Sequence, residues 1–217
     1  MKSYRNGGTD MKLEWKKTEK DIYLPGKSPV LVTVPKMTYV TVKGRGNPNA
    51  PAFADTIQLL YSFSYGIKMM PKSGHTPPGY EEYAVYPLEA TWSIQSEWDE
   101  QHPLNKDELD YTAMIRQPSF VTDEVFALAA EKVAKKKLDL PVEKASLTVL
   151  EEGLCVQLLH IGSYDDEPAS FAKLHNFMAE NKLKRRGEVH REIYLSDPRK
   201  VAPDKLRTVL RYQVEVI

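Results

Sequence analysis

Tyr39-Val-Thr-Val-Lys-Gly44-Arg-Gly46 is repeated later in the chain as Val156-Gln-Leu-Leu-His-Ile-Gly162-Ser-Tyr164. A proline and a phenylalanine follow the glycine in each copy, and Phe53 and Phe171 both lie nine positions after Gly44 and Gly162, respectively. A repeat of this length indicates a duplicated fold unit rather than a short solenoid repeat. Two such units usually enclose a groove, and grooves of this kind bind small molecules.

The pattern of apolar and β-branched residues predicts the same order of elements in each copy. The first unit, residues 30–121, is expected to hold strands over 30–43, 83–94 and 109–117 and a helix over 52–65. The second unit, residues 147–217, is expected to hold strands over 147–161, 189–195 and 205–216 and a helix over 168–181. The predicted fold is α+β: tandem β-α-β-β units forming two antiparallel sheets, with helices on the outside and a shared ligand groove.

The remaining segments are expected to connect or extend these units. Thr122 caps a linker helix that belongs to residues 122–146. Residues 1–29 form an irregular N-terminal extension, and its first ten residues are expected to carry no chemistry. Met11 is an alternative translation start.

Composition narrows the possible partners. The chain of 217 residues has 30 Lys and Arg against 30 Asp and Glu, and this balance argues against direct binding of nucleic acid. The single cysteine, Cys155, fits a buried strand position better than a nucleophile. Without a disulfide framework, signal peptide or long apolar run, we expect a cytoplasmic protein with no membrane partner. Because one chain supplies both halves of the groove, we expect a monomer.

The strand His190-Arg-Glu192-Ile-Tyr194-Leu195 is the most informative short stretch. Alternation places Ile193 and Leu195 on one face, which we expect the helix to cover, and His190, Glu192 and Tyr194 on the other. If the second face lines the groove, burial raises the pKa of Glu192 and suits it to acid–base chemistry near neutral pH. If Glu192 instead stays ionised, its charge attracts a cationic ligand, and nearby aromatic rings add cation–π attraction. The alternative is a polar face exposed to solvent.

Several stretches resemble the GyrI-like small-molecule-binding proteins, in particular members that stand alone without a DNA-binding segment. The resemblance spans roughly residues 11–217. The most specific match is Glu188-Val-His190-Arg-Glu192-Ile-Tyr-Leu-Ser-Asp-Pro198-Arg, followed by Pro203–Arg211. Leu158–Pro168 and Met114–Val121 resemble other parts of the stand-alone branch.

The resemblance implies a role for Glu192. In this family, ligand-binding domains of multidrug-sensing activators place a glutamate at the matching strand position, among aromatic residues. Stand-alone members include hydrolases that open the cyclopropane ring of DNA-alkylating natural products. By this likeness Glu192 is the acid–base or water-orienting residue, and Tyr65 or Tyr111 is its hydroxyl partner.

Other residues are expected to line the ligand site. Trp92 and Trp98 are candidate aromatic walls, although each single aromatic could instead be part of the core. Glu89 lies on the strand that corresponds to the Glu192 strand and is a candidate symmetry mate. The remaining candidate ligand-binding residues are His160, Tyr164, His190 and Tyr194.

Weaker patterns have simpler interpretations. His160, His190 and Glu192 could ligate a metal, but nothing in their spacing requires it, and we expect neither a metal nor a cofactor. The acidic run Asp165-Asp166-Glu167 precedes a helix and is interpreted as helix capping. Gly44-Arg-Gly46 lacks the third glycine of a dinucleotide-binding loop.

Three functions remain open at this level. The first is a hydrolase of planar, electrophilic toxins, and the second is a module that binds or sequesters aromatic or cationic compounds. The third is inhibition of DNA gyrase by direct binding, which the balanced charge does not support. Binding and undemanding catalysis need the same residues, so the sequence leaves the first two unresolved.

Overall fold

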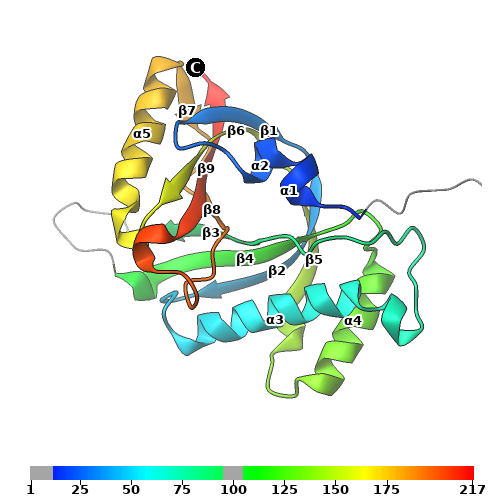
Figure 1. The fold of residues 1–217 in the computed structure, drawn as a ribbon. Helices are drawn as coiled ribbons and strands as arrows, with labels where there is room; N and C mark the ends of the chain where they lie inside the picture. The colour runs from blue at the N-terminus through cyan, green and yellow to red at the C-terminus, as the bar shows by residue number, and fades with distance from the viewer. Residues whose placement is uncertain (1–11, 95–104) are drawn as a thin grey trace, which may run out of the picture.

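The computed structural model describes residues 12–94 and 105–217, so Trp98 lies outside the described part (Figure 1). The α-helices are α1 (Trp15–Thr18), α2 (Lys20–Tyr23), α3 (Pro51–Lys68), α4 (Asp123–Lys136) and α5 (Glu167–Glu180). The strands are β1 (Val30–Val34), β2 (Met37–Arg45), β3 (Leu88–Ile94), β4 (Leu109–Gln117), β5 (Ala145–Leu150), β6 (Gly153–Ile161), β7 (Leu183–Arg185), β8 (His190–Tyr194) and β9 (Arg207–Val216). Short 3-10 turns are η1 (Pro71–Ser73), η2 (Lys106–Glu108), η3 (Val142–Lys144), η4 (Tyr164–Asp166) and η5 (Pro203–Lys205).

The two units share one continuous antiparallel sheet rather than forming two sheets. Its strand order is β1-β6-β9-β8-β3-β4-β2-β5, with β7 paired to β9. The join is the central pair β3–β8, where Ala90 lies opposite Glu192. The α+β fold with a duplicated unit is therefore confirmed, but the expected pair of sheets is wrong, because β3 and β8 hydrogen-bond to each other.

Each unit is completed by a strand from the other. The expected strand over 147–161 divides at Glu151-Glu152: β5 pairs with β2 of the first unit, while β6 belongs to the second. In return, β1 pairs with β6. Only Pro35-Lys36 separates β1 from β2, so the sheet must bend sharply there for the chain to pass between the units (Figure 1).

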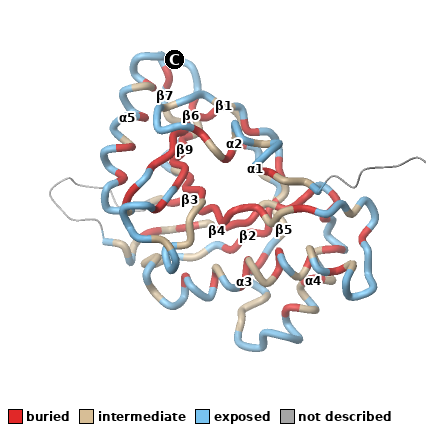
Figure 2. The backbone as a smooth tube through the Cα atoms, in the orientation of Figure 1, coloured by how far each residue is buried: buried red, intermediate tan, exposed pale blue. Residues whose placement is uncertain are grey.

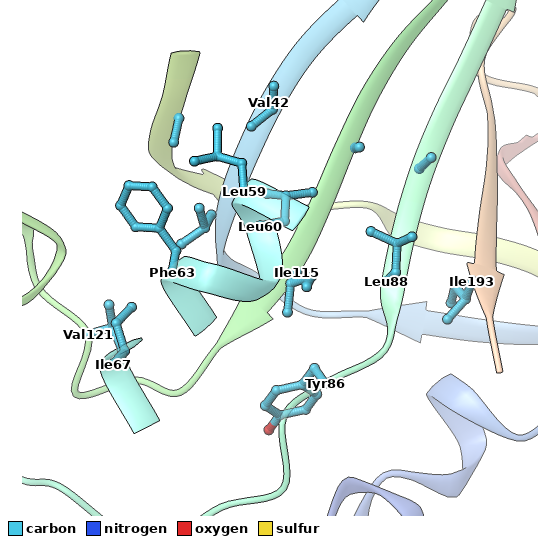
Figure 3. Packing of buried hydrophobic residues seen from close by; sticks show 14 of the residues in the cluster. Val42, Leu59, Leu60, Phe63, Ile67, Tyr86, Leu88, Ile115, Val121 and Ile193 are labelled. Carbon is cyan, nitrogen blue, oxygen red and sulfur yellow. The ribbon is translucent and has the colours of Figure 1, made fainter. Parts of the chain in front are cut away.

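The two long helices cover the outer face of the bent sheet. Leu59, Leu60 and Phe63 of α3 are fully buried in the cluster that contains Val42 and Ile115, and Figure 3 shows Leu59 and Leu60 beside the strands that carry these two residues. The matching contacts of α5 join Leu174 and Met178 to a cluster on β6 and β9 formed by Val156, Leu158, Leu210, Tyr212 and Val214. Figure 2 shows the resulting pattern, with buried strands and exposed outer helix surfaces.

The linker helix α4 packs on α3 and begins where the sequence predicts. The Thr122 hydroxyl accepts a hydrogen bond from the Val125 amide, which caps the helix. The rings of Phe63 and Phe126 stack at 5.0 Å between centroids. The linker thereby extends the apolar core under the first unit.

The N-terminal extension differs from the expectation of irregular structure. The short helices α1 and α2 lie inside the bend of the sheet (Figure 1). Trp15 and Tyr23 are buried there, and the Trp15 indole donates to the Val85 carbonyl at 3.1 Å. Short helices of this kind leave little periodicity in a sequence, because each is only four residues long.

The strand predicted from residue 83 begins only at Leu88. Pro87 has no amide hydrogen to donate to a neighbouring strand, which is consistent with the later start. Tyr83 instead forms an isolated bridge with Leu13. In the described ranges 12–94 and 105–217, no helix is long and apolar enough to cross a membrane.

The strand registers show which residues of the two units are equivalent. In the first unit, Val40 lies four positions before Gly44; it opposes Ile115 on β4, which in turn opposes Leu88 on β3. In the second unit, Leu158 lies four positions before Gly162; it opposes Leu210 on β9, which in turn opposes Glu192 on β8. Leu88 is therefore the counterpart of Glu192. Glu89, expected as its symmetry mate, is one position away and lies on the opposite face of the sheet.

Candidate functional site

Glu192 lies on the face of the sheet that the helices cover. It opposes Leu210 on β9, and Leu210 belongs to the cluster under α5. The expectation that a helix would cover Ile193 instead is wrong. Ile193 faces the inner side and is fully buried in the cluster that contains Tyr23 of α2. Glu192 is 9 % exposed, so it is a buried carboxylate on the outer face and not part of a solvated polar face.

Two residues of the same strand lie beside the Glu192 carboxylate, and Trp92 lies behind them. His190 Nε2 lies 3.0 Å from Glu192 Oε1. Tyr194, two residues along the strand, is close enough for its hydroxyl to interact with Glu192. The indole of Trp92 donates to the Tyr194 hydroxyl oxygen at 2.9 Å, which leaves the Tyr194 hydrogen free for Glu192. Burial, followed by the charge of Glu192, raises the pKa of Tyr194 well above its usual value.

Aromatic rings extend from this centre along both units. Trp92 lies 5.5 Å from the ring of Tyr111 and 5.4 Å from the ring of Phe53, centroid to centroid. On the other side, Tyr164 meets Tyr194 edge to face at 6.1 Å. Such surfaces suit flat or cationic ligands.

Tyr111 joins this aromatic group but does not contact Glu192 through any hydrogen bond found in the described residues. Its hydroxyl lies 3.3 Å from Thr56 Oγ1 on α3. Its ring lies across Gly44, where an added Cβ would come within 2.3 Å of the ring. The repeated glycine of the first unit is thus required for close approach of this tyrosine.

Tyr65 lies elsewhere on the surface. It is 52 % exposed on α3, and its ring stacks on Tyr61 at 6.2 Å. Among the described contacts, none links Tyr65 to Glu192. The tyrosine that the structure brings to the carboxylate is Tyr194, which we expected only to bind ligand.

His160 anchors the start of α5 and is not beside Glu192 as a third metal ligand. Its Nε2 lies 2.9 Å from the Ser163 carbonyl and its Nδ1 lies 2.9 Å from the Ser170 hydroxyl. A carbonyl can only accept, so Nε2 carries a hydrogen, and Nδ1 shares a hydrogen bond with the Ser170 hydroxyl. Both ring nitrogens are occupied, which leaves none for a metal.

Glu89 belongs to a separate group of buried charges inside the bend. Its carboxylate pairs with Arg191 at 2.7 Å, and Arg191 also reaches Glu152 at 3.0 Å. Arg211 pairs with Glu152 at 2.7 Å and donates to the Ile22 carbonyl at 2.6 Å. Burial raises the pKa of Glu89, while Arg191 opposes that shift. Two arginines against two glutamates make this a neutral structural network on the face opposite Glu192.

A second buried carboxyl, Glu167, lies within electrostatic range of Glu192. It occupies the first turn of α5 and is 6 % exposed. Burial, the charge of Glu192 and that of Asp165 raise the pKa of Glu167 to about 9. The carboxyl of Glu167 is therefore protonated at neutral pH.

Comparison with known proteins agrees with this architecture. The model of the GyrI-like small molecule binding domain matches residues 27–215. The chain belongs to this family. No curated protein matches the sequence.

Two solved structures from Listeria innocua cover the GyrI-like chain almost completely. A hydrolase encoded by lin2189 is 36 % identical, with a TM-score of 0.88, over 94 % of this chain and 100 % of its own. An uncharacterized conserved protein is 38 % identical, with a TM-score of 0.87 over the same shares. The EcmrR C-terminal domain shares the fold at 13 % identity and a TM-score of 0.54, over 88 % of this chain and 98 % of its own.

Within this GyrI-like fold, sequence reasoning missed Glu167 by assigning it to helix capping. Its spacing carried a usable signal, because Glu167 lies four residues before Phe171 and so shares a helix face with an apolar side chain. The neighbouring carboxylates of the run behave as expected for an exposed turn: Asp166 accepts from the Ser163 hydroxyl at 2.7 Å. The three acidic residues therefore differ: Glu167 is buried, whereas Asp165 and Asp166 are exposed.

Proposed function

We propose that this protein binds flat aromatic or electrophilic compounds over Glu192 and hydrolyses cyclopropane-containing genotoxins. The observation that carries the proposal is the buried Glu192 carboxylate in contact with His190 and beside Tyr194, with Trp92 behind them. The listerial hydrolase at 36 % identity supports a hydrolytic activity, because its fold and length match throughout.

The chemistry suits a site of this kind. In a cyclopropane fused to a dienone, ring strain and the gain of aromaticity favour ring opening. Water attacks the cyclopropane methylene carbon, and the adjacent carbon–carbon bond breaks. Its electron pair enters the ring, which becomes a phenol as the carbonyl oxygen takes up a proton. Glu192 accepts the proton that the water loses, and a positioned base of this type contributes about 10²–10⁴-fold.

The aromatic residues would position the substrate rather than react with it. Trp92 and Tyr194 are locked by their mutual hydrogen bond, and the rings of Tyr111 and Phe53 support Trp92. A rigid wall holds a flat ligand at a fixed height above the carboxylate, which reduces the entropy lost on reaching the reactive geometry.

The test is mass spectrometry of a duocarmycin-type cyclopropane compound incubated with the protein and with Glu192→Gln. The glutamine keeps the size of the side chain but cannot take up the proton. We expect the water-added product with wild type and a loss of about 100-fold or more in the variant. Intact compound with wild type would refute the hydrolase proposal, and equal rates would remove Glu192 from it.

A second candidate function is binding of aromatic cations without turnover. The specific observation in its favour is a buried carboxylate beside His190, with no Lys or Arg ion pair to Glu192 among the described residues. Such a charge attracts a cation, and the rings of Trp92 and Tyr164 add cation–π attraction. Calorimetry with tetraphenylphosphonium tests this alternative: binding by wild type that weakens in Glu192→Gln, without any product from the cyclopropane compound, would favour it.

A further inference from the structure

We infer that Glu167 is the proton donor of the Glu192 site, so that the reaction runs on a carboxylic acid and a carboxylate with separate roles. This inference rests on the proposed hydrolase function and deepens it. It assigns a catalytic role to the buried acidic residue at the start of α5, which faces the ligand from the side opposite β8.

The contacts on either side of Glu167 place it opposite Glu192. Three residues before Glu167, the ring of Tyr164 meets Tyr194 at 6.1 Å. Four residues after Glu167, the ring of Phe171 meets His190 at 5.0 Å. Glu192 lies midway between His190 and Tyr194 on β8, and the alternation of the strand gives all three the same face. The first turn of α5 therefore presents Glu167 to Glu192.

The position of α5 that makes this possible is fixed by the second glycine of the repeat. Gly162 has φ +145°, and the chain turns there into η4. His160 then ties the turn to the helix through Ser163 and Ser170. These contacts hold Glu167 in place without engaging its carboxyl group.

The carboxyl group itself is left with unused hydrogen-bonding capacity. Glu167 Oε1 is buried and has no hydrogen-bond partner among residues 12–94 and 105–217. Buried polar atoms almost always have partners, and exceptions concentrate where a ligand or a reaction supplies one. A substrate oxygen above Glu192 would supply that partner.

The electrostatics favour a proton on Glu167. Burial and the negative charge of Glu192 raise the pKa of Glu167 to about 9. Two carboxyl groups in one low-dielectric site do not both ionise readily at neutral pH. The raised pKa therefore favours the protonated form of Glu167, which a proton donor requires.

The proton balance closes over one turnover. Glu167 gives its proton to the carbonyl oxygen as the cyclopropane carbon–carbon bond breaks, and Glu192 takes a proton from the attacking water. The net change is addition of one water to the substrate. Transfer of the proton from Glu192 to Glu167 then restores the resting state, and no other reactant is needed.

The experiment compares product formation by wild type, Glu167→Gln and Glu192→Gln between pH 6 and pH 10, on the same cyclopropane compound. Glu180→Gln, an exposed carboxylate at the other end of α5, is the matched control. We expect Glu167→Gln to be slower by about 100-fold or more at pH 7, and Glu180→Gln to match wild type. Wild type should lose activity as the pH rises through about 9, because Glu167 then loses its proton, and Glu167→Gln should lack this step.

These outcomes separate the inference from the proposed function. If wild type and Glu167→Gln make product at equal rates while Glu192→Gln does not, the hydrolase proposal stands and the donor role falls. If wild type makes no product, the hydrolase proposal falls and the donor role falls with it.

An infrared difference spectrum tests the same assignment without substrate. Wild type minus Glu167→Gln at pH 7 should show the carbonyl band of a protonated carboxyl group, and the band should disappear as the pH rises through about 9. A carboxylate band at pH 7 in its place would overturn the inference, whatever the activity of the variant.

Discussion

The two units of this GyrI-like protein have the same backbone order and different residues at equivalent positions. In the second unit, Glu192 lies under α5 with Glu167 facing it. In the first unit, the counterpart of Glu192 is Leu88, which is buried in the core beneath α3. One copy of the duplicated unit contributes apolar packing, while the other carries the polar chemistry. The difference shows that equivalent positions of the duplicated sheet can hold either an apolar side chain or a buried carboxylate.

The largest expected effect on stability comes from placing a glutamate at Leu88, the position of the first unit that corresponds to Glu192. Leu88→Glu places a carboxylate between Ile115 on β4 and Tyr194 on β8, with no Lys, Arg or His at either opposed position. Because it leaves a buried charge unpaired, we expect a loss of about 3–5 kcal/mol in the free energy of unfolding at pH 7, measured by urea denaturation.

The pH dependence of Leu88→Glu gives a second check. Burial raises the pKa of the new carboxyl in the folded state, so the folded protein binds the proton more tightly than the unfolded one. The stability lost at pH 7 should therefore return as the pH falls toward about 4. Leu88→Gln is the control. If Leu88→Glu lowers the free energy of unfolding at pH 7 no more than Leu88→Gln does, water reaches this position and the carboxylate is not buried.

The reverse exchange should affect function more than the fold. Glu192→Leu makes the second unit resemble the first but leaves the His190 nitrogen without its carboxylate partner. We expect a loss of about 1–3 kcal/mol in the free energy of unfolding, while turnover falls by about 100-fold or more. A strongly destabilised variant would mean that Glu192 holds the fold together, as Glu89 does.

The repeated glycines should respond to substitution for different reasons. Gly44→Ala puts a methyl group against the ring of Tyr111, and overpacking of this kind costs about 1–3 kcal/mol. Gly162→Ala meets His160 Nε2 at 3.3 Å but also forces an alanine to φ +145°. Replacement of Tyr111 by leucine should reduce the destabilisation caused by Gly44→Ala and leave that caused by Gly162→Ala unchanged. Double-mutant cycles of Tyr111→Leu with each glycine variant, followed by thermal or urea unfolding, measure both effects. Equal relief at the two glycines would contradict the steric explanation for Gly44.

The smallest expected effect is at the contact between the units. Trp92→Phe keeps a ring on β3 but removes the donor to the Tyr194 hydroxyl. Loss of one such hydrogen bond should cost about 0.5–1.5 kcal/mol in unfolding free energy. Without Trp92, the pKa of Tyr194 should rise further, because this hydrogen bond lowers it. Ultraviolet titration of the tyrosines checks the direction, and a lower pKa would contradict the assignment.

The sequence predicted well the elements that pack within one unit, and poorly the strands β1 and β5 that pair with the other unit. Strand β4 lies where its pattern placed it, and α3 and α4 agree with the expected helices to within a few residues. The break between β5 and β6 was missed, because Glu151-Glu152 lies within a run of strand-forming residues, and pairing with a distant strand leaves no local signal.

The sequence predicted some residues of the candidate site but not their arrangement, and it missed Glu167. Strand alternation grouped His190, Glu192 and Tyr194 correctly, since these three lie within one strand. The face that the helix covers depends on how α5 packs against β6 and β9, which periodicity alone cannot give. The partnership of Trp92 with Tyr194 joins residues 102 positions apart and depends on the β3–β8 pairing.

The exchange of β1 and β5 has a consequence for how such a site can arise. Two separate copies of one unit, each lending its first strand to the other, would build the same sheet as a symmetric homodimer. In that homodimer the positions of Leu88 and Glu192 would have to hold the same residue, so the pair β3–β8 would carry either two carboxylates or none. Joining the copies in one gene removes that constraint, and a single acidic site beside an apolar core becomes possible only after the fusion.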